Sequence, residues 1–272
     1  MLPADASLCL SPARFSVALR LRLWLPIPVG LTHCPGCHAR LDAYGVHLLA
    51  CTRTGRLQRR AKHHERAWKR VLEEAGATRV VFQPLVRSLG VFGIAPNDTR
   101  RLDVAAYGLP DRDLPLLIDC TLRTPLTGQG VPRGGAASIP GSTFSAAYGA
   151  KFNEYRAIAE SGQCQFLVLA AEVFGRFDDP SRRLVASLAR AKVQSLRPIL
   201  RRRMELVWHR RFWGFLSTAV QAAVADCLLP QYLQNGVGSS SRRRPRHGGC
   251  PEHATVLELD HEAPEVSRLP PR

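Results

Sequence analysis

Acidic residues are scarce in this chain. Its 272 residues include 22 Asp and Glu against 38 Lys and Arg, which gives a formal net charge of +16 and a pI near 10.4. Such a surface favours polyanionic partners, nucleic acid above all. A GC-rich genome or a disordered tail could produce the same balance, since arginine greatly outnumbers lysine. Charge alone therefore indicates a partner without indicating a chemistry.

Long apolar runs are also missing. Residues 15–31 are apolar but interrupted by two arginines and two prolines, whereas a membrane span needs about 20 predominantly apolar residues. We therefore expect no membrane partner. The spacing of Phe15, Leu19 and Leu23 predicts instead an amphipathic helix within residues 1–31, running from about 11 to 25. Ser11 is its expected N-cap and Pro12 its first residue.

The chain lacks a recognisable signal peptide, and its eight cysteines do not form the dense framework of a small secreted domain. We therefore expect a reducing compartment and no secretion. With 45% hydrophobic residues and a mean hydropathy of −0.11, the chain can bury one substantial core and a small accessory module.

Three cysteines and a histidine are closely spaced, in the pattern C-x2-C-x9-H-x3-C: Cys34, Cys37, His47 and Cys51. A CxxC turn followed by an HxxxC pair can supply the four ligands of tetrahedral zinc. The pattern predicts a CCHC zinc knuckle over residues 32–55, which would fold a segment too small for its own core. Reduced cysteines in a loop are the alternative, and His33 and His38 compete with His47.

Residues 56–75 predict a basic helix with Trp68, Val71 and Leu72 on one face and Gly76 as C-cap. Short apolar runs then predict a strand over 80–86 and a hairpin whose strands carry Asp103 and Asp119. The composition of residues 125–140 predicts a Gly- and Pro-rich loop. We further expect a helix over 142–161, a buried strand over 165–173, and one or two helices over 181–229, kinked at Pro198.

Asp103 and Asp119 each lie in a short apolar run, and Lys151 follows on the helix-like segment. Two acids on neighbouring strands can hold a hard divalent cation, and a lysine beside them can polarise a phosphate or orient a water. This is the chemistry of a metal-dependent nuclease. Each residue also has an ordinary interpretation, as a strand-end acid bonded to turn amides or as an exposed helix lysine. Glu172, at another strand end, is a further acid candidate or a salt-bridge partner.

Basic residues could also contact nucleic acid outside that site. His63 or His64, near the start of the basic helix, could meet a phosphate or lie on a solvated face. Residues 181–230 combine an apolar stripe with a basic outer face that could follow a phosphate backbone, or that simply faces solvent. Its candidate contacts are Arg201, Arg202, Arg203 and Arg210. Residues 231–272 change composition and predict a disordered tail.

Together these features resemble the C-terminal part of certain non-long-terminal-repeat retrotransposon polyproteins, over roughly residues 10–230. There, a zinc knuckle and a restriction-enzyme-like endonuclease follow the reverse transcriptase. The order of the motifs is more specific than any one of them. The matching features are the Leu-x-Leu-Arg-Leu-x-Leu-Pro run at 19–26, the Cys34/Cys37/His47/Cys51 knuckle, a histidine opening a basic helix, Asp103, Asp119 with Thr121, and Lys151 with Tyr155.

The resemblance implies a PD-(D/E)xK fold: α/β, with a restriction-endonuclease-like mixed sheet flanked by helices over residues 56–180, an N-terminal zinc knuckle and long basic C-terminal helices. Asp103 would be the first acid and Asp119 the second. Lys151 would replace the lysine usually found two positions after the second acid, where this chain has Thr121.

The resemblance also implies a biological setting. Structural Zn²⁺ and catalytic Mg²⁺ would support a nick in target DNA that primes reverse transcription. A reverse transcriptase region is expected upstream, with element RNA as a further partner. A nuclear location follows from the DNA substrate alone.

The chain departs from the family pattern at three places. Leu102 precedes Asp103 where proline is common, Gln83 stands where an acid is frequent, and the reverse transcriptase is absent from the sequence. These departures bear on activity more than on fold, because Mg²⁺ can be held by one or two carboxylates together with substrate phosphate oxygens.

Two other functions compete with the nuclease. One is a catalytically inactive nucleic-acid-binding remnant, which metal-dependent cleavage lost in Asp119→Ala would exclude. The other is hydrolysis by a nucleophilic cysteine, Cys120 or Cys164, which needs a histidine partner. Residues 152–207 contain none.

Overall fold

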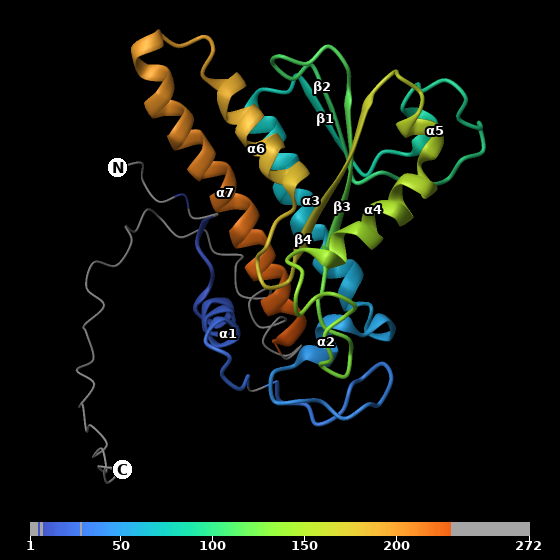
Figure 1. Ribbon diagram of the computed structural model, residues 1–272, viewed down its shortest axis with the longest axis vertical. Helices are drawn as coiled ribbons and strands as arrows, with labels where there is room; N and C mark the ends of the chain where they lie inside the picture. The colour runs from blue at the N-terminus through green and yellow to red at the C-terminus, as the bar shows by residue number, and fades with distance from the viewer. Residues whose placement is uncertain (1–4, 6–7, 28, 230–272) are drawn as a thin grey trace, which may run out of the picture. The chain divides into compact units, whose positions relative to one another are not determined.

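Four strands form a mixed sheet in the order β1-β2-β3-β4 (Figure 1). The structure is a computed structural model that describes residues 5, 8–27 and 29–229, so the tail expected at 231–272 lies outside the described residues. β2 (Val104–Tyr107) pairs antiparallel with both β1 (Arg79–Phe82) and β3 (Leu116–Arg123), and β3 pairs parallel with β4 (Gln165–Glu172). Helices flank this sheet, so the mixed α/β architecture is confirmed.

The two faces of the sheet carry different helices because side chains alternate along a strand. Val104, Ile118 and Leu169 belong to the larger core, under α3, α6 and α7. The adjacent strand residues belong to a smaller core on the other face: Ala105, Leu117 and Val168. Tyr155 and Ile158 also belong to this smaller core. Alternation therefore places Asp103 and Asp119 on the face covered by α4 and α5.

α3 (Arg56–Ala75) has the bounds that the sequence predicts. Its end is fixed by Gly76, which adopts the left-handed φ of 105° that glycine takes without a Cβ penalty. The helix packs against the sheet and against α7, and its side chains Trp68, Val71 and Leu72 are fully buried. Its apolar periodicity was therefore a sufficient guide to the buried face.

Two separate helices, α6 (Asp179–Lys192) and α7 (Pro198–Leu228), follow β4. Pro198 begins α7 and does not kink a longer helix, because proline fits the first helical position, where no N–H is needed. The C-terminal half of α7 carries core residues: Phe212, Phe215, Leu216, Val220, Val224 and Leu228. Only the N-terminal half of this helix is available to act as a basic surface.

α1 (Pro12–Arg22) is capped by Ser11, whose side chain accepts a hydrogen bond from the Arg14 N–H. The helix ends at Arg22, before the expected 25. The helix is rotated relative to the expectation: its buried side chains are Val17, Ala18 and Leu21, and Arg14 pairs with Asp226 of α7 at 2.7 Å. The predicted apolar stripe faces solvent: Phe15 is 57% exposed, Leu19 45% and Leu23 58%.

The remaining short elements border the candidate sites. The turn η3 (Val86–Ser88) follows β1, which ends at Phe82 and not at 86, because Gln83 takes a left-handed φ of 50°. α2 (Val46–Ala50) and η2 (Thr52–Thr54) precede α3. The predicted helix over 142–161 is divided into α4 (Ser142–Glu154) and α5 (Arg156–Ala159).

Residues 125–140 contain no helix or named strand, as their composition predicts. Within the described part of the chain, every helix is too short or too polar to span a bilayer.

Candidate metal and catalytic sites

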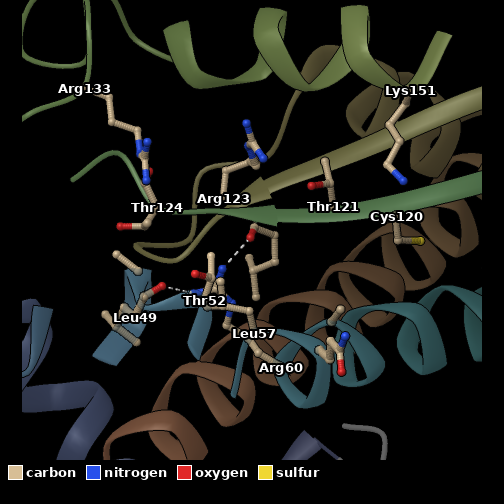
Figure 2. A pocket seen from close by; sticks show the side chains of 14 residues that line it. Leu49, Thr52, Leu57, Arg60, Cys120, Thr121, Arg123, Thr124, Arg133 and Lys151 are labelled. Atoms are coloured by element: carbon tan, nitrogen blue, oxygen red, sulfur yellow. Dashed lines mark hydrogen bonds between the residues drawn. The ribbon is translucent and has the colours of Figure 1, made fainter. Parts of the chain in front are cut away.

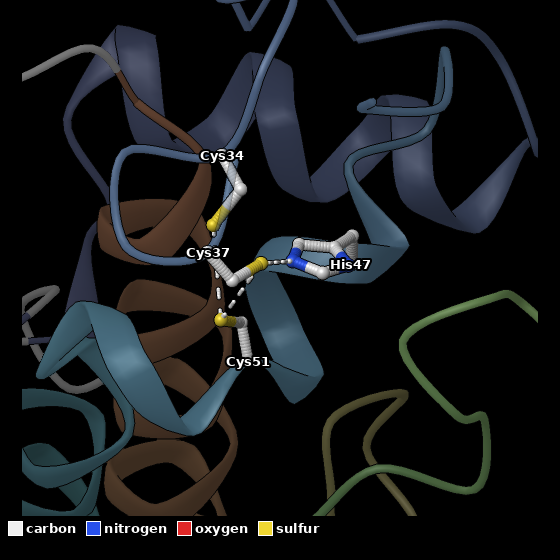
Figure 3. Close-up of side chains that lie close together, drawn as sticks. All are labelled: Cys34, Cys37, His47 and Cys51. Atoms are coloured by element: carbon white, nitrogen blue, oxygen red, sulfur yellow. Dashed lines mark hydrogen bonds between the residues drawn. The ribbon is translucent and has the colours of Figure 1, made fainter. Parts of the chain in front are cut away.

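Three cysteines and one histidine meet in the N-terminal segment (Figure 3). Their ligand atoms all lie within 4.8 Å of one another: Cys34, Cys37, His47 and Cys51. The thiol sulfur of Cys51 is 3.7 Å from that of Cys34 and 3.8 Å from that of Cys37. A zinc tetrahedron with Zn–S bonds of about 2.3 Å has S–S edges of about 3.8 Å. The cluster therefore could bind zinc, and the structure selects His47 over His33 and His38.

The backbone around the cluster is tightly packed. A Cβ added to Gly36 would lie 2.7 Å from the carbonyl carbon of Arg53, so the Cys34–Cys37 turn can approach the chain after Cys51 only with glycine there. His47 Nδ1 is 3.1 Å from the Gly128 carbonyl oxygen. A hydrogen donated from Nδ1 leaves the Nε2 lone pair directed at the cluster, 3.1 Å from Cys37 Sγ.

The cysteines of the cluster are reduced, because sulfur distances of 3.7 Å exceed a disulfide bond of about 2.05 Å. Burial raises the pKa of Cys34, but hydrogen bonds from the Gly36 and Cys37 backbone and from the neighbouring thiols outweigh it and bring the pKa to about 6. A thiolate is the form that binds metal. Among the residues that the structure describes, this is the one group of three or more such side chains close enough to hold an ion.

Asp103 and Asp119 lie at the junction of β2 and β3. The pairing of Val104 with Ile118 puts the two acids on adjacent positions of neighbouring strands. One Asp103 oxygen accepts a hydrogen bond from the Cys120 N–H at 2.5 Å. Asp119 is 3% exposed, and while its Oδ1 lies 3.1 Å from Lys151 Nζ, its Oδ2 is buried without a partner. An unsatisfied carboxylate oxygen is costly, which makes it a natural cation ligand.

The electrostatics of the pair are strongly perturbed. Burial, then the charges of Asp119 and Glu65, raise the pKa of Asp103 to about 8. Burial also raises the pKa of Asp119, to about 6, although the Lys151 ammonium opposes the rise. Acids that are buried together and resist ionisation become easier to ionise when a cation binds between them.

Lys151 extends from α4 toward the acids. Its Nζ lies 3.1 Å from both Asp119 Oδ1 and Glu154 Oε2, and 5.6 Å from the centre of the Tyr155 ring. Burial lowers the pKa of this lysine, but the two carboxylates outweigh burial and raise it. The ammonium is therefore charged at neutral pH. The structure thus brings together Asp103, Asp119 and Lys151, three residues that the sequence places up to 48 positions apart.

Glu65 of α3 is a third carboxylate that the sequence analysis missed. It is 5% exposed, accepts a hydrogen bond from Gln83 Nε2 at 2.9 Å, and raises the pKa of both aspartates. A signal was present, since Glu65 shares the helical face of Trp68, which is buried. Gln83 thus contacts an acid supplied by the helix.

His64 does not contact solvent, which corrects its assignment as a nucleic-acid contact. Its side chain is fully buried, and Nε2 accepts a hydrogen bond from the Trp68 indole N–H at 3.0 Å. Burial lowers the pKa of His64 to about 4, so it is neutral. His63 is partly buried, with Nε2 3.1 Å from Asp226 Oδ2. Both histidines lie well inside α3, away from its N-terminal turn.

The four arginines proposed on the C-terminal helix do not join the acid pair. Arg202, Arg203 and Arg210 are exposed, whereas Arg201 donates from Nε to the Leu196 carbonyl at 2.9 Å. They lie on α7, which packs outside α3 and α6, while Lys151 comes from α4 on the other face of the sheet (Figure 1). Any contact these arginines make with nucleic acid is remote from the aspartates.

Glu172 serves a local structural role. Its buried carboxylate accepts a hydrogen bond from Thr143 at 2.9 Å and lies 3.5 Å from Arg176 Nη1. These contacts join β4 to α4, which agrees with the salt-bridge interpretation of this acid.

No protein-family model matches the chain, and comparison with curated protein sequences gave no match either.

Proposed function

We propose that this chain is a metal-dependent DNA endonuclease domain, a nickase of the kind found in non-long-terminal-repeat retrotransposons, on a restriction-endonuclease-like fold. The observation that carries the proposal is the buried, unpartnered Oδ2 of Asp119, beside Asp103 and with Lys151 at 3.1 Å from the other oxygen. The net charge of +16 supports a polyanionic substrate. Nuclear location and element RNA as a second partner follow from this proposal.

Two carboxylates would hold the catalytic cation. Asp119 would offer Oδ2, and Asp103 would offer a carboxylate oxygen from the neighbouring strand. The charge of Glu65 acts on both aspartates. Bound Mg²⁺ would polarise the scissile phosphate and lower the pKa of a bound water. Asp103 would lose its proton when the cation binds, because its pKa of about 8 without the cation reflects burial among other acids.

Lys151 would stabilise negative charge on the phosphate during cleavage. Its ammonium is preformed and charged, since Asp119 and Glu154 both face it at 3.1 Å. A charge fixed in advance costs no reorganisation during the reaction. Tyr155 positions the end of α4 by donating its hydroxyl hydrogen to the Arg101 carbonyl oxygen at 2.7 Å, two residues before Asp103. This contact ties the lysine helix to the acid strand.

The Cys/His cluster would hold a structural Zn²⁺. Four protein ligands close the coordination sphere and leave no position for water or substrate, so the zinc would carry no chemistry. Its role would be to hold the segment 32–55 against α3 and, through His47 and Gly128, to fix the loop 125–140.

Cleavage of supercoiled plasmid in Mg²⁺ or Mn²⁺ tests the nuclease. Wild type should nick the plasmid, and Asp103→Ala, Asp119→Ala and Lys151→Ala should each abolish nicking while still binding zinc and DNA. Asp113→Ala, which removes an exposed carboxylate from the β2–β3 turn, should cut normally. If the wild-type protein binds DNA and leaves the plasmid supercoiled in both metals across pH, the nuclease proposal fails. The inactive nucleic-acid-binding remnant would then be the better account.

A further inference from the structure

A cavity of about 400 Å³ opens beside Lys151 (Figure 2). It lies between α2 and η2, the first turns of α3, the C-terminal half of β3 and the loop 125–140. One wall is apolar, formed by Leu49, Leu57 and Ala61, and the rest is polar. None of the described residues that line it is an acid. Volume and mixed lining are those of a small-molecule site.

Four cations line this cavity without a carboxylate among them. Arg60 is 5% exposed and donates to the carbonyls of Leu49 and Leu122 at 2.6 Å, yet its Nε is buried without a partner. Arg133 donates from Nε to the Thr124 carbonyl. The Arg123 guanidinium makes no hydrogen bond or ion pair with any described residue. Burial, then the charge of Arg133, lowers the pKa of Arg123.

Arg123 and Arg133 are exposed, and these guanidinium groups repel one another: besides burial, the charge of Arg133 lowers the pKa of Arg123, and that of Arg123 lowers the pKa of Arg60. A bound anion would relieve this repulsion. Phosphate matches their forked donors, whereas a carboxylate of the chain itself is absent from the lining. The apolar wall can pack against a flat aromatic ring such as a nucleic-acid base. The two requirements are met together by a nucleotide, which carries its phosphate and its base on opposite sides of the sugar.

We propose that this cavity binds one unpaired nucleotide of a DNA strand, with its phosphate on Arg123 and Arg133 and its base against Leu49 and Leu57. The inference rests on the proposed nuclease for its choice of DNA, and it names the substrate: DNA with an unpaired or displaced strand. A base inside a duplex is stacked on both faces and cannot enter a cavity of this kind. Lys151 lies on the rim, so the neighbouring phosphate would pass next to Asp119.

Binding by zinc-loaded protein without Mg²⁺ tests the cavity independently of cleavage. The probes are a short fluorescein-labelled single strand and the blunt duplex of the same sequence, followed by fluorescence anisotropy. Arg123→Ala/Arg133→Ala should weaken single-strand binding by about tenfold or more, because two phosphate contacts are lost. Arg79→Ala/Arg87→Ala, which removes the same charge from exposed positions on β1 and η3, should change it by less than about twofold.

A variant that narrows the cavity keeps the test independent of charge. Ala61→Leu adds bulk at the apolar wall and suits a helix, so it should weaken binding of the single strand and spare that of the duplex. A deoxynucleoside monophosphate should compete with the single strand in wild type. Equal losses in the two double-arginine variants, or no effect of Ala61→Leu on a protein that melts normally, would overturn the proposal.

The two proposals fail separately. If the binding pattern holds and the plasmid is never nicked, the cavity stands and the nuclease falls. If wild type nicks plasmid and the single strand binds no better than the duplex, the nuclease stands and the cavity proposal falls.

Discussion

The stability of the protein should depend on pH through Asp103, and Asp103→Asn should remove that dependence. Burial and neighbouring acids raise the pKa of this carboxyl from 3.8 to about 8 in the folded protein. A raised pKa means that the folded state binds the proton more tightly than the unfolded state. The stabilisation is complete below about pH 4 and is lost as pH rises through 8.

The size of the effect follows from proton linkage. Between pH 5 and pH 7 the folded state holds nearly one more proton at Asp103 than the unfolded state, and each pH unit is worth about 1.4 kcal/mol. The upper value is about 2.7 kcal/mol, and partial solvent access to Asp103 reduces it. We expect the difference in free energy of unfolding, Asp103→Asn minus wild type, to increase by about 1 to 2.5 kcal/mol from pH 5 to pH 7.

Urea unfolding without added Mg²⁺ measures this difference. Comparing the two proteins at each pH cancels the titrations that they share, including those of the Cys34 and Cys51 thiols. Asp113→Asn, an exposed aspartate in the same hairpin turn, is the matched control and should track wild type. A difference between Asp103→Asn and wild type that stays constant from pH 5 to pH 7 would refute the buried, acid-crowded site.

Three further predictions concern the metals and the core. Mg²⁺ at about one hundred times its Kd should raise the free energy of unfolding of wild type by about 2.7 kcal/mol at pH 8, as measured by urea titration. The free energy of unfolding of Asp119→Asn should rise far less, and an equal rise in the two proteins would place Mg²⁺ elsewhere. Cys37→Ser should lose zinc in elemental analysis and lower Tm, whereas exposed Cys9→Ser should retain both; zinc retained in Cys37→Ser would contradict the cluster. Trp68→Phe should cost about 1 to 3 kcal/mol in urea unfolding because it leaves buried His64 Nε2 without its donor, and a smaller loss would contradict that hydrogen bond.

Local patterns were sufficient where one element determines the outcome. The apolar period of residues 56–75 and the following Gly76 gave α3 with both ends. The β2–β3 hairpin followed from two apolar runs around a tight turn. The four zinc-type ligands lie within 18 positions of one another, so spacing alone brought them together.

Features that depend on distant partners could not be read from the sequence in this way. The buried face of α1 packs against α7, where Arg14 pairs with Asp226, 212 positions away, and it does not follow the Phe15, Leu19, Leu23 period. The burial of Glu65, in contrast, could have been predicted, because Glu65 shares the helical face of Trp68. The cavity beside Lys151 could not be predicted from the sequence because its lining comes from four stretches of the chain: 49–61, 120–124, Arg133 and Lys151.

The most direct test of the central claim compares wild type with Asp119→Asn in nicking of supercoiled plasmid with Mg²⁺, using preparations with equal zinc content and equal DNA affinity. The account predicts nicking by wild type that requires Mg²⁺ and is lost in Asp119→Asn. Equal nicking by the two proteins, or none by either, would contradict a metal-dependent nuclease at Asp119.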